Sequence, residues 1–383
     1  MRNNSELKAG YGRARLWLGM SGVGTFVVLS AVALFVGFPE ILENWLGDSA
    51  GGRAIAIMLF FSLYAAVHAP FDVFGGYVLP RRFGRPHPTP TRFARRWLRG
   101  IVLHTTVLSI TGIVMLIAGR QLGIFGVVGV GLRLSVGLLA VRRPLASAFA
   151  PIHRHGGMDM TAGENDTRVA TVHSDDQGFT GGFIGVLRPR AILLPARWQE
   201  LLGEEGVELV IERRRLAVRT GSWLRGRILA LVFTWVGIAL CAAFVGPTRL
   251  GTAEGIISLS LWFTLWSFIG LLALPTPSRA GVMEIDRALR RSGQDEGTLR
   301  KIVQQLDQLQ DGEAERPRAV EAIFHPVPAV DNRRDGAGSL QRIGFIDAAR
   351  TAVFVSASGL GLLGRAVHCN CGRPDLWVFL PSD

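Results

Sequence analysis

The sequence predicts an integral membrane α-helical protein with about six transmembrane helices and a small α+β domain between the fourth and fifth of them. Of its 383 residues, 49% are hydrophobic. The mean hydropathy of +0.30 is too apolar for an ordinary soluble protein of this length. The apolar residues come in long blocks rather than at helical spacing, and the first block, 16–38, is uncharged and long enough to cross about 30 Å of hydrocarbon.

Five more apolar blocks follow along the chain: 54–79, 100–119, 121–141, 228–246 and 256–274. They divide the chain into three parts. The first is an N-terminal membrane domain of four helices, 1–141. The second is a domain at 142–310 that the last two helices interrupt, and the third, 311–383, is a linker and C-terminal cytoplasmic tail. Within the third part, the apolar run 352–363 is too short to span a membrane comfortably.

The arginines predict the orientation of these helices. The loop after the second block contains a run of arginines and no acid, whereas the loop after the first block contains Glu40, Glu43 and Asp48. By the positive-inside rule, both termini and the 142–227 segment face the cytoplasm. We therefore expect a plasma-membrane protein, in the inner membrane of a bacterium.

Charge and cysteine content narrow the choice of partners. The formal net charge of +12 comes mostly from arginines beside membrane blocks, where they set topology and contact anionic lipid. The expected partner is therefore the lipid bilayer rather than a nucleic acid. Three cysteines do not make a disulfide framework. The oligomeric state does not follow from the sequence.

The polar stretch between the fourth and fifth blocks predicts strands followed by a helix. β-Branched runs separated by Gly and Pro, at 168–173, 183–187 and 191–194, indicate a small sheet. From Ala196 the apolar residues recur at helical spacing, and after the sixth block 278–310 reads as one or two amphipathic helices.

The order of these elements resembles a known family. A stretch at 181–195, GGFIGVLRPRAILLP, precedes a helix that contains Glu212. Two membrane blocks follow, and then Ser278-Arg279 leads to Asp286. This resembles the HtpX-like membrane zinc metallopeptidases over about 168–290, and the 187–195 stretch is also similar to BlaR-type sensor peptidases. The resemblance implies a metallopeptidase-like (zincin-like) domain on the cytoplasmic side.

The zinc-binding motif of that family is degenerate here. In the family a helix reads His-Glu-x-x-His, and a Glu four residues before an Asp supplies the third ligand. The resemblance places Ile211 and Arg215 at the two histidine positions and Val282 at the glutamate position. Only Glu212, the general-base position, and Asp286 keep the family's residue types. Zinc needs three neutral or anionic donors, so we expect no zinc and an inactive Glu212, which would pair with Arg215 instead.

The resulting hypothesis is a pseudopeptidase that serves as a scaffold or regulator for membrane or unfolded polypeptides. A strand edge near 179–194 would hold an extended peptide by strand addition. One alternative is an active zinc metalloendopeptidase with non-standard ligands from His368, Cys369 and Cys371, with His325 as a possible fourth. Another is a transporter, which predicts that His68, Asp72 and Arg133 converge inside the bilayer.

Overall fold

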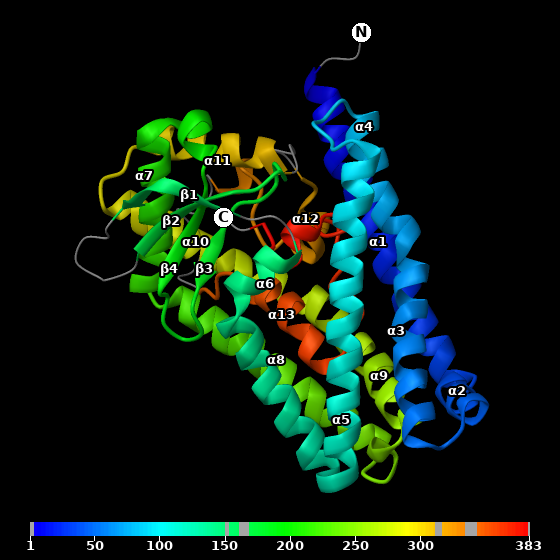
Figure 1. Ribbon diagram of the computed structural model, residues 1–383. Helices are drawn as coiled ribbons and strands as arrows, with labels where there is room; N and C mark the ends of the chain where they lie inside the picture. Colours follow the sequence, from blue (N-terminus) through cyan, green and yellow to red (C-terminus); the bar gives the residue numbers. More distant parts are fainter. Residues whose placement is uncertain (1–3, 150–152, 161–167, 311–315, 334–342, 382–383) are drawn as a thin grey trace.

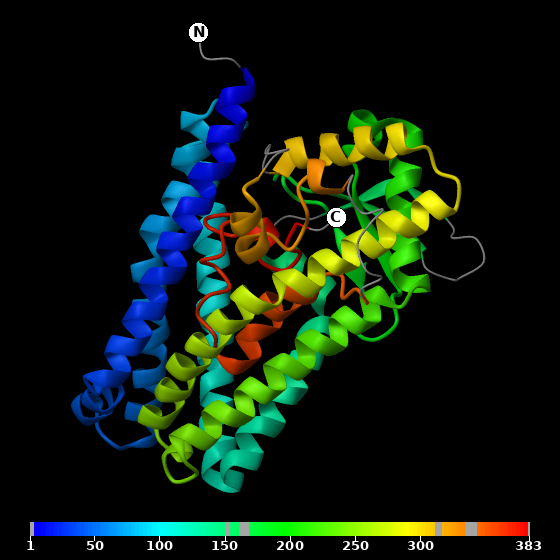
Figure 2. The same cartoon turned by 180° about the vertical axis from the view of Figure 1, so that it is seen from behind.

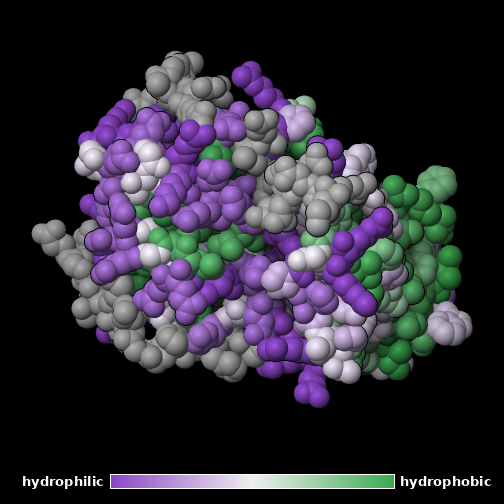
Figure 3. Space-filling view, turned by 90° about the horizontal axis from the view of Figure 1, so that it is seen from above, coloured by the Kyte–Doolittle hydropathy of each residue, from purple (hydrophilic) through white to green (hydrophobic). Residues whose placement is uncertain are grey.

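The structure is a computed structural model, and it describes residues 4–149, 153–160, 168–310, 316–333 and 343–381. Long helices converge at one end of the molecule and diverge at the other end, where the strands lie (Figures 1 and 2). Among the described residues, five helical stretches are long and apolar enough to cross a membrane: Gly10–Phe35, Ala50–Arg82, Pro90–Ala140, Ser222–Val245 and Ala253–Arg291. In Figure 3, hydrophobic residues lie on the side of the molecule where the N-terminal membrane-length helices are, whereas the part that contains the strands is largely hydrophilic.

Two antiparallel helices and a short connecting helix open the chain. They are α1 (Asn4–Phe35), α2 (Phe38–Leu46) and α3 (Ala50–Val73). The Ser49 hydroxyl caps α3 by accepting a hydrogen bond from the Gly52 amide at 3.0 Å. A π-helical turn, Phe74–Val78, continues α3 into α4 (Leu79–Arg82) without a break. A π-helical turn of this kind leaves local backbone groups open to contacts from outside the helix.

The next helix, α5 (Pro90–Ala140), contains a sharp reversal. Gly123 has φ 55° and ψ −134°, which no helix contains, and glycine adopts such a conformation without steric cost. The two halves are in contact beside the reversal, since a Cβ at Gly126 would meet the Ala118 carbonyl oxygen at 2.2 Å. The predicted blocks 100–119 and 121–141 thus share this one kinked element, and five candidate membrane-spanning stretches stand where six were expected.

A four-stranded sheet follows the short helix α6 (Arg142–Phe149). Its strands are β1 (His153–Met160), β2 (Arg168–His173), β3 (Gly182–Ile184) and β4 (Ala191–Pro195), in the spatial order β1-β2-β4-β3. The central pair β2–β4 is parallel, and both edge strands run antiparallel to their neighbours. β3 is therefore an edge strand, and it lies within the 179–194 stretch of the sequence.

The remaining described helices are mostly amphipathic or membrane-length, as the hydrophobic pattern predicts. Their bounds are α7 (Trp198–Arg219), α8 (Ser222–Val245), α9 (Ala253–Ala273), α10 (Pro275–Arg291), α11 (Glu296–Gln310), α12 (Arg318–Phe324) and α13 (Ala348–Val355). One face of the sheet packs on α7, α10 and α11, and the other packs on the end of the chain. The sheet is thus covered on both faces.

The C-terminal part of the chain, predicted to be a linker and tail, packs against the rest of the molecule. Residues 344–381 are largely buried, with α13 against α8 and the following turns among the membrane helices (Figures 1 and 2). The buried Ser260 hydroxyl donates to the Leu360 carbonyl oxygen at 2.7 Å, and Tyr64 donates to Leu362 at 2.9 Å. The apolar run 352–363 is too short to span but fills the core between longer helices, because its non-helical turns find hydrogen-bond partners there.

Candidate functional site

Two of the three predicted ligand positions, Ile211 on α7 and Val282 on α10, belong to the apolar core, whereas Arg215 on α7 is half-buried. Ile211 is 2% exposed and Val282 is 1% exposed, and both pack in the cluster that also contains Ile285. Helical spacing directs these side chains inward, since each is part of the buried face of an amphipathic helix. Close packing therefore occupies the place between α7 and α10.

A buried ion pair joins the same two helices. The Arg213 guanidinium on α7 donates to Asp286 Oδ1 on α10, and the two side chains are 3% and 1% exposed. Arg333 Nη1 lies 3.7 Å from the other carboxylate oxygen, Asp286 Oδ2. Asp286 was predicted to be a retained motif residue, and the structure gives it an arginine partner that the sequence reasoning did not identify.

The neighbouring Arg214 attaches α7 to the sheet. Its buried guanidinium donates to the carbonyl oxygens of Leu193 and Thr180, each at 2.6 Å. The sequence analysis did not identify these two consecutive arginines as buried. A signal was nevertheless present, because Arg213 and Arg214 fall on the side that Val210 and Ala217 define as apolar.

Glu212 points away from this core and is partly exposed. It forms an ion pair with Arg219, two turns further along α7, with 28% of the glutamate side chain accessible. The prediction that Glu212 pairs with Arg215 is therefore wrong. A guanidinium is long enough to reach back over about 10 Å of helix rise, so Arg219 reaches the carboxylate from the end of the helix.

The residues at the family's ligand positions do not fit a zinc ion. Ile211 and Val282 have no donor atoms, and Arg215 carries a permanent positive charge. Elsewhere in the described parts of the chain, no three His, Cys, Asp or Glu side chains gather closely enough to hold a metal. The three side chains at these positions therefore provide no set of donors for a zinc ion.

The alternative cluster near the C-terminus is folded into a tight turn. Cys371 is fully buried, and its thiol lies 3.4 Å from the Ala366 carbonyl oxygen. Burial raises the pKa of the Cys371 thiol to about 12, which disfavours the thiolate that binds metals. Cys369 Sγ lies 3.5 Å from the Asn370 side-chain oxygen. The centre of the His368 ring lies 5.3 Å from that of His325, with the ring planes tilted by 57°, beside a cavity of about 90 Å³.

The polar groups of the second membrane helix form a buried network with the end of the chain. His68 Nδ1 lies 3.3 Å from Asp72 Oδ1, and both side chains are fully buried. Asp72 also accepts hydrogen bonds from Trp97 Nε1 at 3.0 Å and from the Gly372 amide at 2.7 Å, and it pairs with Arg365.

The transporter hypothesis required a third member of this network. It predicted that Arg133 joins His68 and Asp72 inside the bilayer, but Arg133 lies exposed on α5. The arginine that pairs with Asp72 is Arg365, almost three hundred residues further along the chain. The predicted convergence is therefore wrong, because the C-terminal segment supplies the countercharge.

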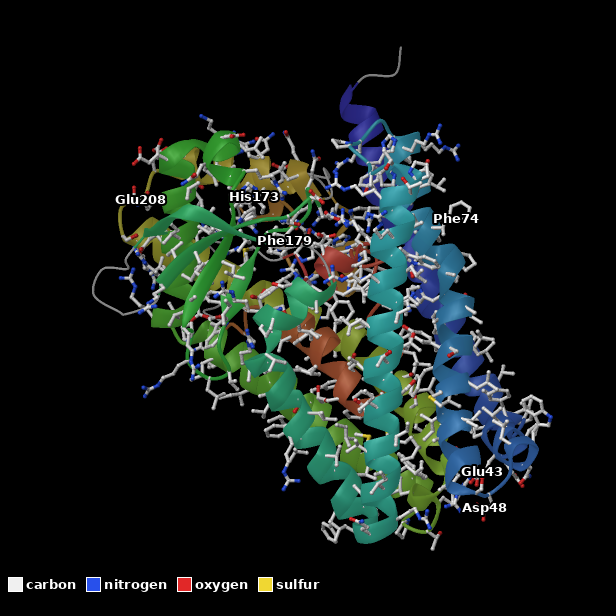
Figure 4. All side chains as sticks on the ribbon, in the orientation of Figure 1. Glu43, Asp48, Phe74, His173, Phe179 and Glu208 are labelled. Carbon is white, nitrogen blue, oxygen red and sulfur yellow. The ribbon has the colours of Figure 1, made fainter. Side chains whose placement is uncertain are left out.

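The 179–194 stretch faces the chain's own C-terminal segment. Phe179 is fully buried, and its ring lies 6.3 Å from that of Phe379. Figure 4 shows Phe179 where the sheet meets the rest of the molecule, whereas Glu208 lies on the outer side of α7. A Cβ at Gly182 in β3 would meet the Phe379 ring at 3.0 Å. This side of the edge strand is therefore covered, while Leu187 in the adjoining turn remains 52% exposed.

Comparison with known proteins agrees with this architecture. Residues 3–141 match a family model described as "CAAX prenyl protease N-terminal, five membrane helices". Eight chains of solved structures match significantly. One is the crystal structure of S. mikatae Ste24p, with a TM-score of 0.63, 10% identity, and coverage of 88% of this chain and 99% of that chain. The chain therefore has a fold similar to that of Ste24p. No curated protein matches its sequence significantly.

The membrane helices of the matched family model and the long apolar helices of this chain both indicate an integral membrane protein. The family model covers the N-terminal membrane helices alone, so it does not reach Glu212 or Asp286. At 10% identity the structural likeness to Ste24p shows the fold alone.

Proposed function

We propose that this chain is a membrane-embedded, HtpX-like peptidase homologue that has no peptidase activity and binds polypeptides as a scaffold or regulator. The observation that carries the proposal is the chemistry between α7 and α10. Ile211 and Val282 contribute apolar packing at two of the ligand positions. Without three donors, a bound water does not reach a pKa near 7, so Glu212 has no hydroxide to generate.

The experiment that tests this proposal measures zinc content and proteolysis on the same detergent-purified protein. We expect no stoichiometric zinc, and no cleavage of unfolded casein above that of a Glu212→Gln control. About one zinc per chain, as a single catalytic site requires, together with casein cleavage that Glu212→Gln abolishes, would instead establish the active peptidase. Loss of that zinc in Cys369→Ser/Cys371→Ser would then assign the non-standard ligands.

The proposed polypeptide partner would bind near the exposed turn that follows β3. Edge strands present unpaired backbone groups that can bind an extended chain, and Leu187 is the exposed apolar residue beside this edge. A photo-cross-linking residue at Leu187 should attach to unfolded casein. A residue of similar exposure on α7, Leu201 at 47%, serves as the matched control. Equal cross-linking at both positions would argue against a binding edge.

We further propose that the two halves of α5 are separate spans, which makes six, and that the strand-bearing end faces the bacterial cytoplasm. Glu43 and Asp48 lie at the end of the molecule opposite the sheet (Figure 4). The arginine-rich turn between α4 and α5 lies at the other end (Figure 1). A membrane-impermeant thiol reagent should label Asp48→Cys from outside intact cells and should label Arg92→Cys only after lysis.

A further inference from the structure

A short segment near the C-terminus lies against α8 and α10 next to the degenerate motif. The segment comprises residues 344–349, and we call it the resident segment. Ile346 is 6% exposed and packs in the same apolar core as Ile211 and Val282. The resident segment thus contributes a side chain to the core that occupies the place between α7 and α10.

Side chains of α8 and α10 hold this segment by its backbone. The Ile346 amide donates to Ser222 Oγ at 3.2 Å, and the Ala349 amide donates to Ser278 Oγ at 3.0 Å. Both serines are at most 1% exposed. Their hydroxyl oxygens therefore serve as acceptors for peptide groups, which every polypeptide carries.

A charged pair binds the start of the segment in the same manner. The Gly344 amide donates to Glu284 Oε2 at 3.0 Å, and Arg225 Nε donates to the Gly344 carbonyl oxygen at 3.0 Å. Glu284 and Arg225 also bind each other, with Arg225 Nη2 at 2.9 Å from both carboxylate oxygens. One residue of the segment therefore has both its donor and its acceptor satisfied by side chains.

Glycines bring the segment close to the two helices. A Cβ at Gly226 would lie 2.0 Å from the Ile346 carbonyl oxygen, and a Cβ at Gly281 would lie 2.4 Å from the Ile346 amide nitrogen. Any side chain at either position would displace the segment. Because Gly226 and Gly281 have no side chains, the backbone of the resident segment can lie in contact with both α8 and α10.

We infer that this surface of α8 and α10 is a polypeptide-binding site whose present ligand is the chain's own residues 344–349. The α8–α10 site consists of Ser222, Arg225, Gly226, Ser278, Gly281 and Glu284. The α8–α10 site binds backbone groups of a non-helical, non-strand segment and one apolar side chain, which is that of Ile346 in the resident segment. A partner polypeptide binds here by displacing the resident segment. The inference rests on the proposed polypeptide-binding role and names the site and the ligand class.

Covalent attachment gives the resident segment an advantage over a free peptide, because a linked ligand acts at an effective concentration on the order of millimolar. A free peptide should therefore bind weakly to the unmodified chain and much more tightly once the resident segment has lost its donors. Gly344→Pro/Ile346→Pro removes the two amide groups that Glu284 and Ser222 accept.

The test is fluorescence anisotropy with a labelled synthetic peptide of sequence 341–351, QRIGFIDAART, and full-length protein in detergent. We expect the Gly344→Pro/Ile346→Pro protein to bind the peptide at least tenfold more tightly than the unmodified protein does. Adding Ser222→Ala/Ser278→Ala should abolish the gain. A peptide with Asp at the Ile346 position should not bind. Absence of binding to the folded proline variant, or binding that the serine substitutions leave unchanged, overturns the inference.

A second measurement needs no variant and covers the case in which the proline variant does not fold. In the unmodified protein, a millimolar excess of the peptide should speed amide hydrogen exchange of residues 344–349. The same peptide with Pro at the 344 and 346 positions should have no effect, and equal exchange with both peptides contradicts the inference. Loss of cross-linking at Leu187 with peptide exchange intact would instead count against the proposed partner at the β3 edge alone.

Discussion

Arg365, near the end of the chain, forms a buried ion pair with Asp72 in the second membrane helix. The carboxylate of Asp72 also accepts the Gly372 amide, so one acidic residue holds two points of the C-terminal segment. Charged groups buried among membrane helices reduce the stability of the fold unless they are paired and hydrogen-bonded. The pair therefore explains how a polar turn is retained inside a membrane bundle.

Removing the arginine should release this turn. Arg365→Met leaves Asp72 without its countercharge, and we expect a loss of about 3–5 kcal/mol in the free energy of unfolding. The direct readout is the thiol of Cys371, which is fully buried. In a Cys241→Ala/Cys369→Ala background, maleimide labelling of Cys371 should accelerate at least tenfold. Arg92→Met, which alters an exposed ion pair, should leave the labelling rate unchanged.

The ion pair between Arg213 and Asp286 predicts strong coupling between α7 and α10. Either Arg213→Met or Asp286→Leu removes one partner of this buried ion pair and should cost about 3–5 kcal/mol. The double substitution removes both charges and should cost clearly less than the sum of the two single ones. Denaturant unfolding in detergent measures all three variants. Additive losses would show that the pair does not connect the helices.

The same cycle on an exposed pair provides the control. Arg92 and Asp175 form an ion pair in which the two side chains are 60% and 39% exposed. Solvent screens such a pair, so each substitution there should change the free energy of unfolding by less than about 1 kcal/mol.

Restoring the three donors should create a zinc site if the motif positions have been assigned correctly. Ile211→His/Arg215→His/Val282→Glu supplies two imidazoles and a carboxylate. We expect this variant to retain zinc after dialysis and its Tm to rise when zinc is added. Ile211→Leu/Arg215→His/Val282→Glu lacks the first donor and should do neither. Equal behaviour of the two variants would mean that the assignment is wrong.

Two glycine substitutions distinguish a steric clash with the resident segment from the general effect on stability of replacing a helical glycine. Gly226→Val places side-chain atoms against the Ile346 carbonyl oxygen and should destabilise the protein by about 3 kcal/mol. Gly137→Val on α5 is the matched control, because no neighbouring atom lies within 4 Å of its Cβ position. Thermal unfolding in detergent compares them. A similar Tm for both variants would argue that the resident segment does not lie on Gly226.

Stability should also depend on pH through Asp176. Burial would raise the pKa of this carboxyl, but Arg373 offsets burial and lowers the pKa to about 2. Since the folded-state pKa is below that of the unfolded chain, the contribution is complete above about pH 4 and is lost as pH falls toward 2. It amounts to about 2 kcal/mol. Asp176→Asn should lack this acid-dependent loss, and an identical pH profile for both proteins would contradict it.

Hydrophobic blocks in the sequence predicted the membrane character correctly, because crossing a bilayer requires long apolar helices whatever the rest of the fold does. The predicted boundary between the blocks 100–119 and 121–141 lies close to Gly123, where α5 reverses. Only Arg120 and Gln121 interrupt the apolar residues there, so the helix continues through the boundary as one kinked element. The β-branched runs likewise located β2 and β4, since their residues alternate with turn signals.

The sequence by itself determined that Ile211, Arg215 and Val282 supply no zinc ligand in any conformation, because two of these side chains are aliphatic and the third is a guanidinium. It also indicated an apolar run near the C-terminus. Only the tertiary structure decided what takes the place of those donors, because Arg213 and Asp286 are far apart in the chain and Ile346 reaches the same core from a later segment. Arg365, the partner of Asp72, could not be identified from the sequence for the same reason. Local patterns report which face of a helix is buried, but the identity of a buried partner depends on contacts between distant segments, and a single sequence contains no local signal for them.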